Sequence, residues 1–368
     1  MSKTIHIAPD TACDSALIAK VMAALELGKL VLLPTETVYG IAARADNPEA
    51  LAALAAAKLR PEGEPFTWHV GGTDCLTALG GESPMIQRLA ERYWPGPLTL
   101  VLPDHNGYLP GIGSDGRVGV RLTAHHGTAS ILSALPFPVV MTSANLHGED
   151  PACSVEDLNS AVRDAISLIV TDGPARIGES STVLRAGRVS GETSWRFELL
   201  REGLHGLDAL RSTAGRRIVF VCTGNTCRSP LAEGLAKQAL SHELGCSHSS
   251  LDDFGFHVSS AGVYAYGGGS ISSHSYEQLK RRGVDLGDHR ATTATERLLS
   301  RADKIYCLSQ GHLNGVLDQI PSERAHTAEL LDVNGADVPD PIGGSSADYS
   351  RCAEHIEGLI KARIREWV

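Results

Sequence analysis

Short apolar runs recur along the chain, and each is typical of a buried strand. Such runs occupy residues 28–34, 97–100, 118–122, 139–142 and 217–222. Several of them lead into loops rich in hydroxyl side chains, such as residues 35–40 and 143–148. Residues 51–58 and 230–237 instead carry apolar side chains at helical spacing. Strands that alternate with helices predict an α/β chain.

The helix expected at residues 48–58 has well-defined ends. Asn47 is a favourable N-cap and Pro48 suits the first turn. Pro61 prevents continuation and extends the residue before it, so Lys58 and Arg60 are expected side by side where the helix stops. Two cations at a helix C-terminus are an ordinary stabilising arrangement. A phosphate-binding role for them therefore needs support from other motifs.

The chain has 368 residues, which predicts two domains of ordinary size. The segment at residues 204–215 ends in a small and polar stretch before a new strand. We therefore expect a first domain at residues 1–205, a linker at 206–215 and a second domain at 216–368.

Composition excludes several classes of protein. The formal net charge is −10, whereas tight nucleic-acid binding usually requires a basic surface. None of the eight cysteines has CxxC spacing, so neither a zinc site nor a disulfide framework is indicated. The sequence contains no apolar run of signal-peptide or membrane-spanning length. These features predict a cytoplasmic protein that binds neither membranes nor, tightly, nucleic acid.

The most informative motif is VFVCTGNTCRSP at residues 219–230, between an expected strand and an expected helix. A tight loop at a helix N-terminus presents free backbone N–H groups that can surround a phosphate. In this setting Cys222 is a candidate thiolate nucleophile and Arg228 offers a planar fork for two phosphate oxygens. Ser229 can donate a hydrogen bond to the sulfur. Further along, the loop VPDPIGG holds Asp340, a candidate proton donor for the leaving group.

These residues resemble the low-molecular-weight protein phosphatase family over about residues 216–368. The match includes CTGNTCRSP, SAGV at 260–263, DHR at 288–290 and the Asp340-Pro pair. The resemblance implies a parallel sheet flanked by helices and a reaction without a cofactor. It also implies Cys222 as nucleophile, Arg228 as phosphate clamp, Asp340 as general acid and phosphorylated proteins as substrates.

Thr226 bears on which phosphorylated residue is the substrate. Phosphotyrosine members of the family usually carry Ile or Leu here, which favours a flat apolar ring. Bacterial protein-arginine phosphatases resemble this chain better, and a hydroxyl can accept a hydrogen bond from a guanidinium. The resemblance therefore favours phosphoarginine, with phosphotyrosine as the alternative. Thr226 serving only the loop backbone is a second alternative.

The first half carries seven short motifs in a fixed order. They are PTETVYG at 34–40, the Lys58-x-Arg60-Pro pair, PGPLTLVLP at 95–103, GVR at 119–121, TSAN at 142–145, STV at 181–183 and LREG at 200–203. This series resembles the threonylcarbamoyl-AMP synthase family, also called YrdC-like. The resemblance implies a twisted α/β sheet around a positively lined cavity. It also implies condensation of L-threonine, bicarbonate and ATP into threonylcarbamoyl-AMP and pyrophosphate, a nucleotidyl transfer that supplies tRNA-modifying machinery.

The same resemblance implies roles for individual residues. The residues expected to bind ATP are Lys58, Arg60, Ser143, Asn145 and Arg201. Those expected to bind threonine are Thr35, His69, Arg121 and Ser181. Mg²⁺ is expected to accompany ATP. One position departs from the family, because many members have Lys or Asn where this chain has Glu64. A carboxylate there weakens triphosphate binding unless it points outward or helps to hold Mg²⁺. The alternative is that this half is a non-catalytic ligand- or RNA-binding module that targets the phosphatase.

Overall fold

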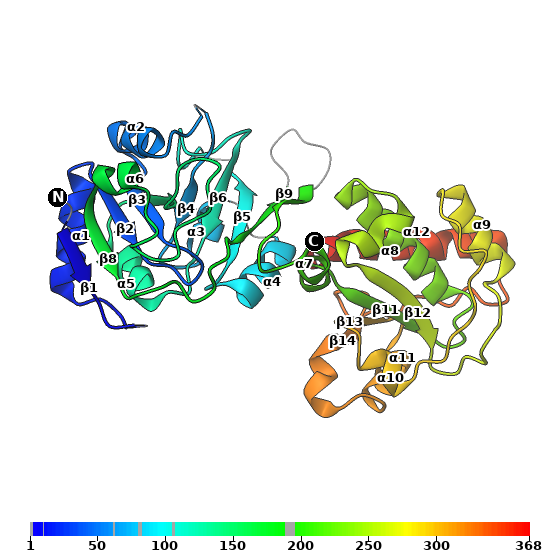
Figure 1. Ribbon diagram of the computed structural model, residues 1–368. Helices are drawn as coiled ribbons and strands as arrows, with labels where there is room; N and C mark the ends of the chain where they lie inside the picture. The colour runs from blue at the N-terminus through cyan, green and yellow to red at the C-terminus, as the bar shows by residue number, and fades with distance from the viewer. Residues whose placement is uncertain (1–2, 10, 62, 80–82, 105–106, 188–195) are drawn as a thin grey trace. The chain divides into compact units, whose positions relative to one another are not determined.

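The computed structural model describes residues 3–9, 11–61, 63–79, 83–104, 107–187 and 196–368. The chain divides into two compact units, Met1–Leu210 and Arg211–Val368. Both units are α/β, as the sequence predicts (Figure 1). In the described part of the chain, we find no helix with the length and hydropathy that crossing a membrane requires.

The first unit is built on one mixed sheet of ten strands, in the order β1–β8–β2–β3–β7–β4–β6–β5–β9–β10. Parallel and antiparallel neighbours both occur: β4 runs parallel to β6 and antiparallel to β7. The strands are β1 (Lys3–His6), β2 (Leu30–Leu33), β3 (Gly40–Arg44), β4 (Thr67–His69), β5 (Leu98–Pro103), β6 (Arg117–Arg121), β7 (Val139–Ser143), β8 (Ile166–Thr171), β9 (Thr182–Gly187) and β10 (Arg196–Arg201).

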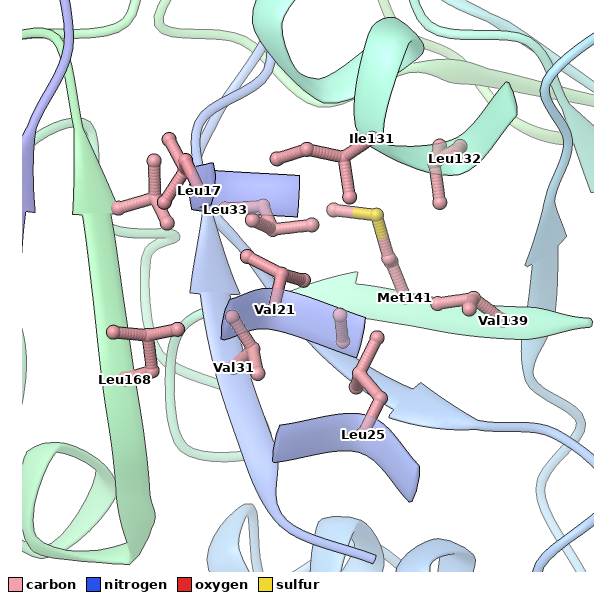
Figure 2. Packing of buried hydrophobic residues seen from close by; sticks show 12 residues of the cluster. Leu17, Val21, Leu25, Val31, Leu33, Ile131, Leu132, Val139, Met141 and Leu168 are labelled. Carbon is pink, nitrogen blue, oxygen red and sulfur yellow. The ribbon is translucent and has the colours of Figure 1, made fainter. Parts of the chain in front are cut away.

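The helices of the first unit are α1 (Ser15–Glu26), α2 (Pro48–Ala57), α3 (Cys75–Ala78), α4 (Pro84–Tyr93), α5 (His126–Ala134) and α6 (Ser160–Ala165), and α7 (Leu207–Ala214) follows β10. Among them, α1 and α2 pack against β2 and β3, and α6 packs against β8. Figure 2 shows Val21 and Leu25 of α1 beside Val31 of β2, with Ile131 of α5 close to Met141 of β7. All five of these side chains are buried, so this layer anchors one end of the sheet.

The other part of the sheet, from β4 to β9, uses its two faces differently. Leu98, Leu100, Val118, Val120 and Leu184 are buried in the core. Residues that alternate with them line a cavity, as the period of a strand requires. The register of β4 on β6 places His69 beside Arg121. Pairing of strands far apart in sequence therefore assembles the cavity.

The second unit has a sheet of four parallel strands in the order β12–β11–β13–β14. The strands are β11 (Arg217–Cys222), β12 (His257–Gly262), β13 (Lys304–Cys307) and β14 (Ala328–Leu330). The helices are α8 (Arg228–Leu244), α9 (Ser273–Arg281), α10 (Glu296–Leu299), α11 (Gln310–Leu317) and α12 (Ser346–Arg363), with 3-10 turns at His248–Phe254, Ser322–Thr327 and Ile364–Glu366. Cys222 ends β11 and Arg228 starts α8, so the loop between them lies at the carboxyl edge of the sheet, as predicted.

The segment expected to be a linker holds the helix α7. Its apolar residues Leu210 and Ala214 are buried, and Asp208 and Arg211 lie in its first and last turns, where their charges suit the helix dipole. The division between the two units falls inside this helix, after Leu210. Residues 211–215 are mostly small and polar, so the sequence did not indicate a helix with Leu210 and Ala214 buried.

Candidate functional sites

A cavity of about 270 Å³ in the first unit is lined by residues of β3, β4, β5, β6, β7, β9 and β10 and of loops beside them. Among the described residues that line it there is no carboxylate. Its lining includes five arginines and several hydroxyl side chains: Arg60, Arg117, Arg121, Arg185, Arg201, Thr35, Thr142, Ser143 and Ser181. This composition suits an anionic ligand, because the cations offset phosphate or carboxylate charge in a partly dry site.

Arg121, at the end of β6, is fixed by a buried carboxylate. Its Nη2 donates to Glu36 Oε1 and to Thr37 Oγ1, each at 2.7 Å. Both side chains of the Arg121–Glu36 pair are 7% exposed. Burial opposes ionisation of Glu36, but Arg121 and the Thr123 hydroxyl outweigh it and lower the pKa of the carboxyl. Glu36 therefore stays charged and holds Arg121 through Nη2, whereas Arg121 Nε is buried and has no hydrogen-bond partner among the described residues.

His69 ends β4 beside Arg121 and is neutral. Burial, and then the charge of Arg121, lower the pKa of this histidine to about 3. Its Nδ1 lies 3.2 Å from the Thr67 carbonyl oxygen, so we assign the ring proton to Nδ1. That assignment leaves Nε2 as a hydrogen-bond acceptor at the cavity.

Thr35 and Ser181 contribute hydroxyls from two different turns. The Thr35 hydroxyl donates to the Val38 carbonyl at 2.6 Å, which folds the turn after β2. Ser181 Oγ lies 3.0 Å from Thr99 Oγ1 and accepts from Arg201 Nη2 at 3.1 Å. Arg201 also donates twice to the Ser181 carbonyl. Arg201 and Ser181 thus form one connected part of the wall.

Lys58, like Asn145, lies outside the cavity that Arg60, Ser143 and Arg201 line. It caps α2 and is 3% exposed, and its ammonium contacts the Ser143 carbonyl, the Asn145 carbonyl at 2.7 Å and Asn145 Oδ1 at 3.1 Å. Neither Lys58 nor Asn145 lines the cavity, whereas Ser143 does. In this structure Lys58 therefore holds the loop that carries Ser143.

Arg60 lines the cavity, where its Nη1 donates to Thr142 Oγ1 at 3.4 Å, and three further neighbours hold it. Its Nη2 donates to the Pro65 carbonyl at 2.7 Å, and its guanidinium lies 5.0 Å from the Phe66 ring centroid. Glu64 Oε2 lies 3.2 Å from Arg60 Nε, with the Glu64 side chain 34% exposed and outside the cavity lining. The carboxylate that departs from the family pattern thus orients Arg60 from outside.

In the second unit, the loop after β11 surrounds the sulfur of Cys222. This sulfur lies 2.9 Å from Ser229 Oγ. Asn225 Nδ2 donates to Ser229 Oγ at 2.9 Å, so the hydroxyl keeps its own proton for the sulfur or for the Ala261 carbonyl, which lies 3.2 Å away.

Asn225 is the central residue of this loop. Its φ of 55° is in the left-handed region, which asparagine tolerates better than most residues. The fully buried side chain also donates to Ser260 Oγ at 2.8 Å and accepts from the Thr292 N–H at 2.8 Å. It thereby ties the loop to β12 and to a segment that follows it.

Arg228 and Asp340 are brought together from distant segments. Arg228 Nη2 lies 2.5 Å from Asp340 Oδ2, and Arg228 Nη1 donates to the Val338 carbonyl at 3.2 Å. The Asp340 carboxylate is 38% exposed, whereas the guanidinium is 8% exposed. The candidate phosphate clamp and the candidate acid are thus adjacent.

Thr226 stands in the same loop, next to Cys227. Its Oγ1 lies 3.7 Å from Cys227 Sγ, and Cys227 Sγ lies 3.3 Å from the Tyr349 hydroxyl. The Thr226 carbonyl accepts from the Ser272 N–H at 2.9 Å. The structure shows no hydrogen bond from the Thr226 hydroxyl to the described loop backbone.

Sequence reasoning missed several residues of both sites. Glu36 lies inside the PTETVYG motif, so the motif itself was the available signal. Arg117 and Arg185 could have been found from strand alternation alone, because Arg117 shares a face with Arg121. Asn225 was visible in the loop, but no local pattern indicates that Ser260 and the Thr292 N–H are its partners.

Comparison with known proteins gives matches in both halves. Residues 23–203 match the Sua5/YciO/YrdC family model, described as "Telomere recombination". Residues 217–366 match the low molecular weight phosphotyrosine protein phosphatase model. A threonylcarbamoyl-AMP synthase of Chromohalobacter salexigens is 36% identical over 155 residues, which are 41% of this chain and 83% of that protein. A protein-arginine-phosphatase of Bacillus subtilis is 34% identical over 147 residues, 39% of this chain and 91% of that protein.

Longer relatives match only in part. The threonylcarbamoyl-AMP synthase of Pyrococcus abyssi is 35% identical over 212 residues, which are 56% of this chain and 60% of that protein. The chain thus spans less than two thirds of that relative. A solved structure of P. abyssi Sua5 shares the fold, with a TM-score of 0.50 at 24% identity over 89% of this chain and 98% of that chain. The chain belongs to the threonylcarbamoyl-AMP synthase family through its first unit and to the low molecular weight protein phosphatase family through its second.

Proposed function

We propose that the protein is a bifunctional enzyme, which forms threonylcarbamoyl-AMP in its first unit and dephosphorylates proteins in its second. For the first unit, the observation that carries the proposal is a cavity with five arginines and no carboxylate among its described lining residues. For the second, it is the sulfur of Cys222 held 2.9 Å from Ser229 Oγ in a loop that begins a helix.

In the first unit, catalysis would consist of positioning and charge stabilisation. Arg121 Nε, buried and without a partner among the described residues, would take the threonine carboxylate, and His69 Nε2 would accept a hydrogen bond from the same ligand. Arg60 and Arg201 would offset the phosphate charge of ATP. The loop of Ser143, held by Lys58, would close the nucleotide end of the cavity.

Mg²⁺ would enter this site with ATP. Among the described residues no group of three His, Cys, Asp or Glu side chains could hold a metal ion. The lining offers neutral oxygen donors such as the Ser143 and Ser181 hydroxyls. This set fits an ion that takes its ligands mostly from phosphate and water, and the charge of such an ion would help to neutralise the triphosphate.

In the second unit, Cys222 Sγ would attack phosphorus while the bond to the leaving group breaks, giving a phosphocysteine. Asp340 would donate its proton to the leaving group, and Arg228 would hold two phosphate oxygens. Water would then attack the phosphocysteine, with Asp340 taking the proton of the water. The Ser229 hydroxyl would stabilise the departing sulfur.

We propose phosphoarginine as the preferred substrate and phosphotyrosine as the second candidate. Support comes from the match to a protein-arginine-phosphatase over most of that protein's length. The Thr226 hydroxyl is available at the loop to accept a hydrogen bond from a guanidinium N–H, which an aryl phosphate does not offer. The structure shows it in contact only with Cys227 among the described residues.

Thr226→Ile is expected to shift substrate preference toward phosphotyrosine. Loss of one hydrogen bond to a polar substrate group lowers kcat/KM for phosphoarginine, by on the order of tenfold. The isoleucine side chain should leave the aryl substrate unharmed or improve its binding. Initial rates on both substrates give the ratio of kcat/KM values, with Thr226→Ser as the control that retains the hydroxyl. An unchanged ratio in the isoleucine variant would refute the assigned role.

Glu36→Ala is expected to lower the stability of the first unit and to raise its KM for threonine. Removing one partner of a buried ion pair leaves an uncompensated charge and costs about 3 kcal/mol or more. Chemical denaturation should therefore show a lower free energy of unfolding, and the KM for threonine should rise because Arg121 loses its fixed orientation. Glu49→Ala, at the exposed start of α2, is the control. An unaltered KM in a folded Glu36→Ala protein would contradict the assignment of Arg121 to threonine.

One assay distinguishes a synthase from the alternative, in which the first unit is a ligand-binding module without catalysis. Release of pyrophosphate from ATP that requires both threonine and bicarbonate supports the synthase. Purified, folded protein that releases none would favour the binding module.

A further inference from the structure

A short line of polar contacts leads from the start of α11 to the phosphate clamp. Ser309 Oγ lies 2.8 Å from His312 Nδ1, and His312 Nε2 lies 2.8 Å from Thr223 Oγ1. Thr223 is the residue after Cys222, and its Oγ1 lies 3.5 Å from Arg228 Nη2. His312 thus contacts the catalytic loop from a helix 89 residues away in the chain.

The direction of these hydrogen bonds follows from what each group can donate. A guanidinium only donates, so Thr223 Oγ1 accepts from Arg228. We assign the imidazole proton to Nδ1, where it is donated to Ser309 Oγ. Thr223 then donates to Nε2 and keeps its lone pairs directed toward Arg228.

The surroundings keep His312 uncharged. The side chain is 5% exposed. Burial, and then the nearby charge of Arg228, lower the pKa of His312 to about 4, although Asp340 and Asp337 act in the opposite direction. A neutral ring can accept the Thr223 proton at Nε2, which an imidazolium cannot do.

Thr223 and Asp340 contact the same nitrogen of Arg228. Arg228 Nη2 contacts both Thr223 Oγ1 and Asp340 Oδ2. In the proposed reaction Asp340 must turn to the leaving group, and Thr223 is then the side-chain partner that still orients Nη2. A fixed guanidinium plane matters because two parallel hydrogen bonds to phosphate require it.

We propose that His312 is a positioning residue of the phosphatase site, which orients the Arg228 guanidinium through the Thr223 hydroxyl. The proposal deepens the proposed function of the second unit and rests on it. It assigns His312 no contact with the substrate. His312 acts only on the geometry of the clamp.

The test measures two quantities, inhibition by inorganic phosphate and kcat/KM for 4-nitrophenyl phosphate, on full-length protein. His312→Leu and Thr223→Val should each raise the inhibition constant for phosphate and lower kcat/KM by about tenfold, because each disrupts the same contact to a charged group. The double variant should lose no more than either single variant. His312→Gln and Thr223→Ser, which keep a polar atom in place, should recover most of the loss.

Controls separate this result from unfolding and from failure of the proposed function. His326→Leu changes an exposed histidine of the same unit and should behave as the wild type. Additive losses in the double variant, or unchanged phosphate inhibition in folded His312→Leu and Thr223→Val, would overturn the proposal. Should His312→Leu fail to fold, the two single variants Thr223→Val and His312→Gln still test the proposal, the first by its loss and the second by its retained activity. Wild-type protein without any phosphatase turnover would instead refute the proposed function.

Discussion

Cys222→Ser is expected to abolish phosphatase turnover while leaving pyrophosphate release by the first unit intact. Replacing the nucleophile removes the covalent route, and losses on the order of 10⁴-fold or more are typical. The serine oxygen is a much weaker nucleophile in the same position, since an alcohol does not ionise at neutral pH. Both activities can be measured on one preparation, with phosphoarginine as substrate for the second unit.

The matched control for this variant is Cys246→Ser. It changes another free cysteine of the same unit, which follows the C-cap residue Gly245 of α8. It should retain full phosphatase activity. Alkylation by iodoacetamide should inactivate the wild type in step with modification of Cys222, and inorganic phosphate should protect it. Retained turnover in Cys222→Ser would refute the phosphocysteine mechanism. Parallel loss of pyrophosphate release would show that the two units are coupled.

The catalytic loop of the second unit was largely predictable from sequence. Its strand, loop and helix are contiguous, so local pattern and residue type place Cys222, Arg228 and Ser229 together without knowledge of the rest. Asp340 was recognisable as a carboxylate in a Pro-flanked loop, and the family resemblance then implied its role as general acid. Its approach to Arg228 depends on the packing of residues 338–344 beside the parallel sheet, which no local pattern specifies.

The residues that orient this loop were beyond sequence reasoning for the same physical reason. Asn225 bonds to Ser260 and to the Thr292 N–H, and Thr223 bonds to His312. Each contact joins segments that are distant in the chain, and serine, threonine or a lone histidine carries little signal by itself. Such polar partners become recognisable only when burial shows that they must be satisfied.

In the first unit, the structure gives Lys58 a different role from the one expected. The family resemblance implied an ATP-binding role for both Lys58 and Arg60, which stand close together where α2 ends. The backbone reverses locally at Leu59, with a φ of 51°, and sends the two side chains to different partners. Arg60 reaches the cavity, whereas the Lys58 ammonium turns to the loop of Ser143 and Asn145.

This placement gives Lys58 a distinctive dependence on pH. Burial, and then the charge of Arg60, lower the pKa of Lys58 from 10.5 to about 8. The ammonium has three protons for its three oxygen acceptors, and the neutral amine formed above about pH 8 has only two. Synthase activity should therefore decline above about pH 8. The contribution of Lys58 to stability rises over the same range, because the unfolded chain binds more protons there.

Lys58→Ala is expected to lower threonine- and bicarbonate-dependent pyrophosphate release by on the order of 10²-fold or more, because a loop that carries cavity residues loses its anchor. Phosphatase turnover should remain as in the wild type. Lys20→Ala, an exposed cation on α1, is the control and should leave both activities unaltered. Lys58→Arg retains the charge at high pH. If the decline above about pH 8 reflects loss of the Lys58 proton, this variant should move it upward, whereas an unmoved decline would assign it to another group.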